Sequence, residues 1–506
     1  MKARGQTMQE DHRRLARRAG EGLKQADLSA LEHGPHDARS LSDAITDAGI
    51  SGVSVDPATG MATGFTPDGR DAVIELATAL RAAWGKSGYT LRNETLAKVI
   101  ADEIKKLWST RDVSSLTDDD FDELGDAIEG WFASYDVVRE HIVPCTVFAM
   151  PVGPFTIGPI TFYHAHELPT ETFGMKPDEF WPPAPPRWKQ RLDAILAAIR
   201  NREVTTPKPG GWQMGHLLEF AAARNAPYLA IVEVSGRGPK ESAVVAEMAT
   251  DIALAAVQLV SPSEDMRVLS RATARVAPIH PVRASRIGDG PFSMELSNRQ
   301  PGLARAPGLI SAHLRAAQPV LDVMGRRLTA YVHAVDAFPI LNEAWCNAAY
   351  WYHEALAEPL DTIAVAKLET AIEVLMRAES MKGSKRRLLE AFDAFFGLSA
   401  DDPVIENGPT VSEIITGITT ARSRVLHGTW PTIHTDLPDA KGAPAITFGI
   451  VEEVARLLLL FSAQHLDVYG KDGQSADDTA AFLTWIKSTR DRAADEGGTE
   501  DTSSEP

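Results

Sequence analysis

Residues 411–428 carry the sequence VSEIITGITTARSRVLHG, which predicts one amphipathic helix and its end. Its apolar side chains recur at spacings i, i+4, i+7 and i+11, as expected for a face packed on other helices: Ile414, Ile418, Ala421 and Val425. At ~100° per residue, Arg422 lies about 70° from the centre of this stripe, and His427 lies about 150° away on the other side. Gly428 favours the end of the helix. We therefore expect Arg422 and His427 to lie outside the core, facing solvent or a partner.

The sequence around this helix predicts a compact α-helical bundle. From residue 344 onward strand signals almost disappear, and helical patterns cover residues 344–357, 361–380, 385–396, 411–427 and 450–468. Pro359, Gly383 and loops at 399–409 and 431–444 separate these helices. We assign residues 336–490 to the bundle. Residues 491–506 are acidic and of low complexity, so we expect a disordered tail.

The upstream sequence makes the whole chain a predicted α+β multidomain protein. Residues 1–120 are expected to be mainly helical, with an apolar stripe at helical spacing in 71–84. A helix is expected at 119–138, and residues 121–335 are expected to form a mixed, β-rich domain. Its β-branched and aromatic run at 142–162 indicates two or three strands, and 228–235 indicates a buried strand. Helices are expected at 191–200 and 241–259, but the role of this domain is not readable from its residues.

Composition narrows the class of protein without deciding it. The chain has 506 residues, 44% of them hydrophobic and 24% charged, as in soluble globular proteins. Its net charge of −18 argues against broad electrostatic coating of nucleic acid but leaves room for a nuclease with a local basic cleft. No apolar run approaches the ~18 residues of a membrane span, and the charged N-terminus is no secretory signal. The two cysteines are far apart, which favours reduced thiols in a cytoplasmic protein.

Arg422 and His427 suit the chemistry of RNA cleavage. Histidine titrates near neutral pH and can take the proton from a ribose 2′-hydroxyl as a general base. An arginine can donate to the phosphate oxygens while charge develops, and Ser423 can add a hydrogen bond. Internal attack would leave a 2′,3′-cyclic phosphate and a 5′-hydroxyl without a metal ion. By spacing alone, however, an Arg-x4-His pair is a weak signal, and a solvated helix end is the alternative.

Further cations are expected to contact the substrate. Arg424 lies within the same segment, and Lys385 and Arg386 belong to a basic cluster at a helix start. A solvated charged face is the alternative interpretation of that cluster. Glu369, on a helix expected to pack nearby, is a candidate ion-pair partner for Arg422, although a simple surface salt bridge explains the pair equally well.

Two segments resemble a known family. Residues 420–428 (TARSRVLHG) resemble the signature helix of the HEPN superfamily, specifically its ApeA-like bacterial members, and residues 364–376 (AVAKLETAIEVLM) resemble that family's second helix. The resemblance covers about residues 340–470, and the run PFTIGPITF looks like the β-rich region preceding such domains. It implies RNA cleavage by a dimer, often in phage defence or as a toxin. Arg422 and His427 match its catalytic pair and Ser423 its polar position, whereas the loop after Gly428 departs from it.

The sequence therefore predicts a cytoplasmic, homodimeric, metal-independent endoribonuclease without a cofactor, acting on tRNA or single-stranded RNA. No membrane is expected to be involved, and a phage-derived or cellular trigger fits the family. One alternative is a non-catalytic HEPN module that binds a nucleotide or protein or acts as a sensor. Another is a hydrolase in the middle domain that uses His164 or His166. The aromatic loop at Trp181 and Trp188 is a further candidate surface, although packing under a long loop is the default.

Overall fold

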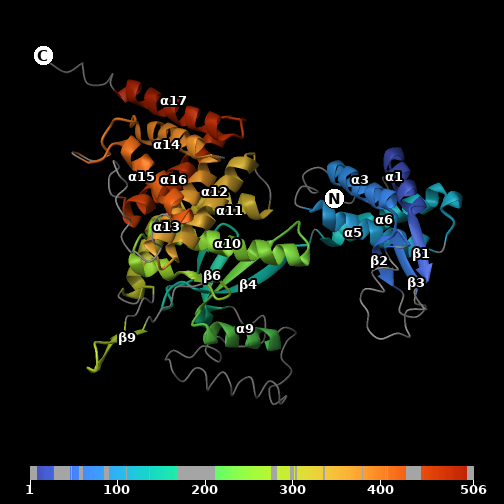
Figure 1. Cartoon of the computed structure of the whole chain (residues 1–506), viewed down its shortest axis with the longest axis horizontal. Helices are drawn as coiled ribbons and strands as arrows, with labels where there is room; N and C mark the ends of the chain where they lie inside the picture. Colours follow the sequence, from blue (N-terminus) through green and yellow to red (C-terminus); the bar gives the residue numbers. More distant parts are fainter. Residues whose placement is uncertain are drawn as a thin grey trace. The chain divides into compact units, whose positions relative to one another are not determined.

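The computed structural model describes residues 8–27, 46, 48–55, 61–84, 91–109, 111–135, 137–168, 211–274, 282–296, 301–302, 305–333, 337–378, 380–404, 406, 408–428 and 446–497. They form a mixed α+β protein whose C-terminal region is helical (Figure 1). The chain divides into two compact units, the first made of residues 1–139 and 235–242 and the second of 140–234 and 243–506. The expected helix at 191–200, the aromatic residues Trp181 and Trp188, and the loop after Gly428 lie outside the described residues.

In the part of the first unit that the structure describes, four α-helices combine with a small sheet. The helices are α1 (Glu10–Glu21), α3 (Pro67–Ala83), α5 (Asn93–Trp108) and α6 (Asp118–Tyr135). The antiparallel strands β1 (Leu23–Asp27), β2 (Ser51–Val55) and β3 (Met61–Phe65) lie in the order β1-β3-β2. The predicted helix at 71–84 is confirmed as part of α3, since its apolar stripe, with Leu76 fully buried, faces the core.

Close packing in this unit depends on glycine. A side chain on Gly22 would lie 2.4 Å from the Cα of Gly69, so α1 ends directly against the start of α3. The backbone N–H of Thr66 donates to the carbonyl of Gly22 (2.8 Å), and the Thr66 hydroxyl accepts from the N–H of Gly69 at the start of α3 (3.3 Å). Any larger residue at either glycine would push the two helices apart.

The second unit begins with a five-stranded sheet. Strands β4 (Arg139–Thr146), β5 (Phe155–Ile157), β6 (Ile160–His164), β7 (Tyr228–Val234) and β8 (Ser270–Arg271) lie in the order β5-β6-β7-β4-β8. They confirm the strands expected at 142–162 and 228–235. Helix α9 (Gly211–Ala223) precedes β7, and β9 (Val282–Arg286) pairs with β10 (Phe292–Leu296) in a separate exposed hairpin.

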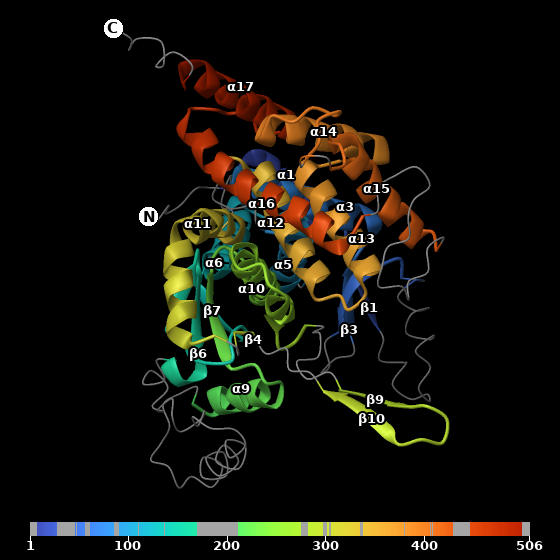
Figure 2. The same ribbon diagram turned by 90° about the vertical axis from the view of Figure 1, so that its left-hand side faces the viewer.

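Two long helices cover this sheet and join it to the bundle. Helix α10 (Pro239–Val260) confirms the helix expected at 241–259, and α11 (Pro307–His333) packs against β5 and then against the bundle helices (Figure 2). By length and composition residues 241–260 are apolar enough to cross a membrane, but 72% of that window is buried inside the fold. Helix α10 is therefore a core helix of the second unit, whose apolar side chains belong to the same hydrophobic core as the sheet and the bundle.

The C-terminal bundle contains the expected helices and one more. They are α12 (Pro339–Leu356), α13 (Asp361–Met376), α14 (Met381–Phe396), α15 (Val411–Leu426), α16 (Phe448–Lys471) and α17 (Thr479–Gly497). Helix α17 was not expected, and it extends to residue 497, so the prediction of a disordered tail from residue 491 is wrong for residues 491–497. The buried side chains of Phe482 and Ile486 dock α17 on the bundle, and Arg490 donates to the carbonyl of Asp393 on α14.

The compact units differ from the expected domain ranges. The boundary expected at 120/121 falls inside α6, which belongs wholly to the first unit. The boundary expected at 335/336 separates no units, because the sheet, α10, α11 and the bundle share one continuous hydrophobic core. The physical reason is that one face of the sheet is covered by helices that also contact the bundle, so neither part has a core of its own.

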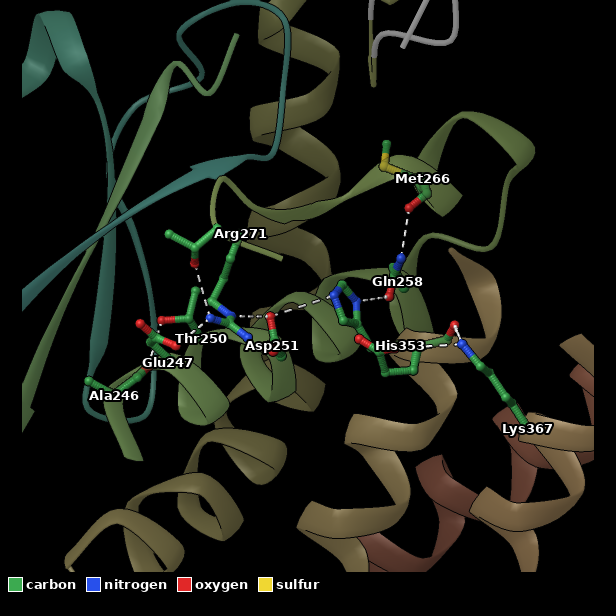
Figure 3. A network of polar contacts seen from close by, with 11 residues as sticks. Ala246, Glu247, Thr250, Asp251, Gln258, Met266, Arg271, His353 and Lys367 are labelled. Carbon is green, nitrogen blue, oxygen red and sulfur yellow. Dashed lines mark hydrogen bonds and ion pairs between the residues drawn. The ribbon is translucent and has the colours of Figure 1, made fainter. Parts of the chain in front are cut away.

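Buried polar contacts reinforce this continuity (Figure 3). Nδ1 of His353 on α12 lies 2.9 Å from Oε1 of Gln258 on α10, and Nε2 of His353 lies 3.7 Å from Oδ1 of Asp251. Arg271 donates to the same Asp251 oxygen (2.8 Å). Burial lowers the pKa of His353, against the opposing effect of the Asp251 charge. The ring therefore favours its neutral form and acts as a structural link between α10 and α12.

Candidate active site on helix α15

Helix α15 is defined by its own sequence at both ends. The Thr410 hydroxyl accepts a hydrogen bond from the N–H of Glu413 (3.3 Å), and the Glu413 carboxylate accepts one from the N–H of Thr410 (2.9 Å). The predicted apolar stripe is confirmed, because all of its members are at most 5% exposed: Ile414, Ile418, Ala421 and Val425. Gly428, with a φ of 66°, ends the helix as expected, and His427 is the capping residue after the last helical turn.

Arg422 is held by two carboxylates of the neighbouring helix α13. Its Nε lies 3.0 Å from Oε2 of Glu369, and its Nη1 lies 2.5 Å from Oε2 of Glu373. The Glu369 contact is a close ion pair without the alignment of a hydrogen bond. Helix α13 packs directly on α15, so these contacts follow from the packing of the two apolar stripes. The expected pairing of Glu369 with Arg422 is confirmed.

The pair is more than a surface salt bridge, because Glu369 is almost fully buried. Burial, followed by the nearby charge of Glu373, raises the pKa of Glu369 to about 8, and the attraction of Arg422 only partly opposes this. A buried carboxyl beside one cation and one further carboxylate favours its protonated form more than an ordinary glutamate does. With 32% of its side chain exposed, Arg422 retains access to solvent while α13 fixes its position.

The other two predicted catalytic residues lie at the C-terminal end of α15, Ser423 in its last turn and His427 as the capping residue. His427 is exposed, and among the residues that the structure describes none is hydrogen-bonded or ion-paired to its ring. Its backbone N–H donates to the carbonyl of Ser423 (3.0 Å), and Ser423 itself is half-buried. Leu426, beside His427, is 65% exposed. This end of the helix therefore presents a histidine and an apolar side chain to solvent or to a partner.

The cations expected to bind substrate have different surroundings. Arg424 is half-buried on α15. Lys385 is half-buried and Arg386 is exposed on α14, where the Glu390 carboxylate lies 3.0 Å from Nη1 of Arg386. Glu390 also pairs with Arg387 at 2.8 Å. Because one carboxylate serves two arginines, the start of α14 keeps a net positive charge next to α15, with which it packs.

The middle-domain alternative receives little support from its histidine. His164 is 3% exposed at the end of β6, with its ring edge-on to Tyr228 at 5.1 Å between centroids. A histidine enclosed in this way has no access to a substrate. The side chain of His166 lies outside the described residues. Within the described ranges no three His, Cys, Asp or Glu side chains gather as potential metal ligands.

One residue of this site was missed at the sequence level. Glu373 follows Glu369 by four positions, a spacing that places both carboxylates on one face of α13. The sequence shows this spacing, but it does not show which helix packs against α13, so the contact of Glu373 with Arg422 could not be predicted from it. Conversely, Arg422 and His427 are five positions apart on α15, which separates them by about 140° around the helix. A single copy of α15 therefore directs them to different sides.

Comparisons with protein-family models, with curated proteins and with solved structures return no match to this chain.

Proposed function

We propose that the C-terminal bundle is a HEPN-type, metal-independent endoribonuclease whose site is completed by two copies of the chain. The observation that carries the proposal is the end of α15. There an exposed histidine follows an arginine that two glutamates of α13 hold in place. Preorganisation of this kind is what a group that stabilises developing charge requires. The cytoplasmic location and a role in defence or as a toxin belong to the same proposal.

In this mechanism His427 takes the proton of a ribose 2′-hydroxyl. The 2′-oxygen attacks the adjacent phosphorus and the bond to the 5′-oxygen breaks, so that a 2′,3′-cyclic phosphate forms. The leaving oxygen takes a proton from water to become a 5′-hydroxyl, and His427 returns its proton to solvent. Arg422 donates to the non-bridging oxygens as their charge increases, and Ser423 adds a hydrogen bond. Arg424, Lys385 and Arg386 hold neighbouring phosphates of the RNA.

A two-fold dimer would bring Arg422 and His427 together, which a single copy of α15 does not do. If the ends of two α15 helices meet across a two-fold axis, one orientation of that axis brings Arg422 of one copy next to His427 of the other. The exposed Leu426 beside each histidine would be covered in such a contact. A dimer therefore accounts both for the separation of the two residues around α15 and for the exposed leucine.

The test is cleavage of total tRNA and of a single-stranded RNA in EDTA by the full chain and by His427→Ala. We expect cleavage by the parent chain, with cyclic-phosphate ends, and its loss in the variant. A mixture of His427→Ala with Arg422→Lys should recover part of the activity, because one of the two composite sites in a mixed dimer is intact. Full activity of a folded His427→Ala chain, or cleavage that requires an added metal ion, would refute the proposal.

A non-catalytic binding module is the second candidate, and one observation favours it. Two carboxylates contact the Arg422 guanidinium, and this reduces the positive charge that it can offer to a phosphate. Such a module should bind RNA or a partner without cutting it, at any concentration of enzyme and in lysates of phage-infected cells. Retained binding with no new RNA ends under all these conditions would establish this alternative.

A further inference from the structure

A cleft of about 590 Å³ opens in the second unit where α12, α13 and the start of α17 meet. This volume falls within the range of roughly 300–1,000 Å³ typical of small-molecule sites. Apolar side chains from α12 and α13 supply part of its lining: Ile340, Ala344, Val374 and Met376. None of the proposed catalytic residues lines it, so the cleft needs an explanation of its own.

The polar lining of the cleft carries mixed charge with an acidic excess. Glu343 and Asn347 come from one face of α12, and Asp478 and Thr479 come from the start of α17. Arg377 and Arg387 line it as well, as does Glu373. The carboxylates number three and the guanidinium groups two. Arg387 is already paired with Glu390, and Glu373 with Arg422, so among the described lining residues Glu343, Asp478 and Arg377 are the charges left to meet a ligand.

Thr479, one of the residues that line the cleft, has a buried hydroxyl without a hydrogen-bond partner among the described residues. Thr479 is only 6% exposed, yet within the part of the chain that the structure describes its Oγ1 has no hydrogen-bond partner. Buried polar atoms are nearly always paired, because an unmade hydrogen bond away from water is costly. The side chain lines the cleft, but its Oγ1 is enclosed, so a molecule bound there would supply the missing partner only after the side chain rotates toward it.

We propose that this cleft binds a small basic amino acid, or a related molecule that combines a carboxylate with a guanidinium or ammonium group. The cationic group would meet Glu343 and Asp478, the carboxylate would meet Arg377, and an aliphatic stem would lie on Ile340 and Met376. A ligand with net positive charge matches the acidic excess of the lining, whereas a phosphorylated ligand would face more carboxylates than arginines.

Glu373 connects this cleft to the proposed active site. Its carboxylate lines the cleft and also lies 2.5 Å from Nη1 of Arg422. A positive charge bound at Glu343 and Asp478 would also attract the Glu373 carboxylate, so binding should alter how firmly Arg422 is held. This consequence rests on the proposed endoribonuclease function, whereas the binding site itself does not.

The test is titration of the full chain with L-arginine, followed by calorimetry and by thermal shift. Citrulline is the matched probe, because it keeps the shape, the carboxylate and the α-ammonium group but has a neutral urea group in place of the charged guanidinium, and AMP is the phosphorylated probe. We expect L-arginine to bind and to raise the unfolding temperature, with citrulline at least about tenfold weaker, as for the loss of one charge-assisted hydrogen bond.

Two variants locate the site. Glu343→Gln removes the carboxylate and should weaken L-arginine binding about tenfold. Arg377→Gly removes the guanidinium at a residue with a φ of 51°, where glycine is favoured, so this variant should fold normally and bind more weakly. Glu233→Gln, at an exposed position on β7, is the matched control and should bind like the parent chain.

Equal binding of L-arginine and citrulline, preference for AMP, or no binding of L-arginine up to about 10 mM in both measurements would overturn the proposal. So would full binding by both cleft variants. These outcomes are independent of RNA cleavage. If L-arginine binds but RNA is not cleaved, the proposed endoribonuclease function is refuted and the ligand site stands. If RNA is cleaved but L-arginine does not bind, the ligand site is refuted and the endoribonuclease function stands.

Discussion

Nε of Arg422 on α15 lies 3.0 Å from Oε2 of Glu369 on α13, and it is the carboxylate that is almost fully buried while the guanidinium remains partly exposed. The contact therefore holds the Arg422 guanidinium on the side that faces α13, and the other side of the guanidinium remains exposed to solvent. Glu373 contacts the same guanidinium, so a single cation lies against two carboxylates of α13. The stability of this arrangement depends on pH and on both partners, which makes it open to experiment.

The first prediction concerns Glu369. Its pKa is raised to about 8 by burial and by Glu373, from an ordinary value of 4.5, so the folded state binds this proton more tightly than the unfolded state does. The stability from this group is full below pH 4.5 and is lost as the pH rises through about 8. Glu369→Gln, which cannot ionise, should therefore gain stability relative to the parent chain between these pH values.

Urea denaturation at pH 5, 6.5 and 8 measures this difference (these values are about evenly spaced across the transition). The midpoints of the parent chain and the variant should diverge as the pH rises. Glu140→Gln, at an exposed position on β4, is the control and should follow the parent chain. Parallel midpoints for Glu369→Gln would show that the carboxyl is ionised in the folded protein over this range.

The second prediction concerns removal of the cation. Arg422→Ala leaves the Glu369 and Glu373 carboxyls without a positive partner, and we expect a loss of about 1–3 kcal/mol in the free energy of unfolding at neutral pH. Adding Glu373→Gln should recover part of that loss, because it removes the uncompensated negative charge that Glu373 then has beside the buried Glu369 carboxyl. A double-mutant cycle from denaturation curves measures the coupling, and strictly additive effects would contradict it.

The third prediction separates catalysis from stability at His427. The residue is exposed at the end of α15, so His427→Ala should change the free energy of unfolding by no more than about 0.5 kcal/mol. Cleavage of RNA should fall by at least about 100-fold, the contribution typical of a general acid–base group. His216→Ala, on α9, is the matched control and should keep full activity. A large loss of stability in His427→Ala would instead indicate a structural role.

The fourth prediction compares two apolar residues of the same helix. Ile418 is fully buried and Leu426 is 65% exposed. Ile418→Ala should cost about 2–5 kcal/mol, because it leaves a cavity between α15 and its neighbours. Leu426→Ala should cost less than about 0.5 kcal/mol in the isolated chain but should weaken dimerisation if the helix ends meet. Denaturation and analytical ultracentrifugation check the two effects, and an unchanged dimer would remove Leu426 from the interface.

Local sequence patterns predicted the secondary structure of the bundle well. The stripe through Ile414 and Val425, the start at Thr410 and the stop at Gly428 depend on residues within a few positions of one another, and helix geometry fixes their relation. The strands at 142–162 and 228–235 were recognisable for the same reason. Helix α17 was missed, because its acidic C-terminal end resembles a disordered tail in the sequence. In the structure the side chains of Phe482 and Ile486 are buried against the bundle, and this packing stabilises the helix.

The sequence by itself determined that Arg422 and His427 lie off the core of α15, since the periodicity of one helix decides which side chains face inward. Only the tertiary structure decided that Glu369 and Glu373 hold Arg422, that burial raises the pKa of Glu369, and that Glu373 also lines the cleft beside α12 and α17. These relations join side chains from helices that are far apart in the sequence. They depend on which helices pack together, which is set by the whole core and not by any local pattern.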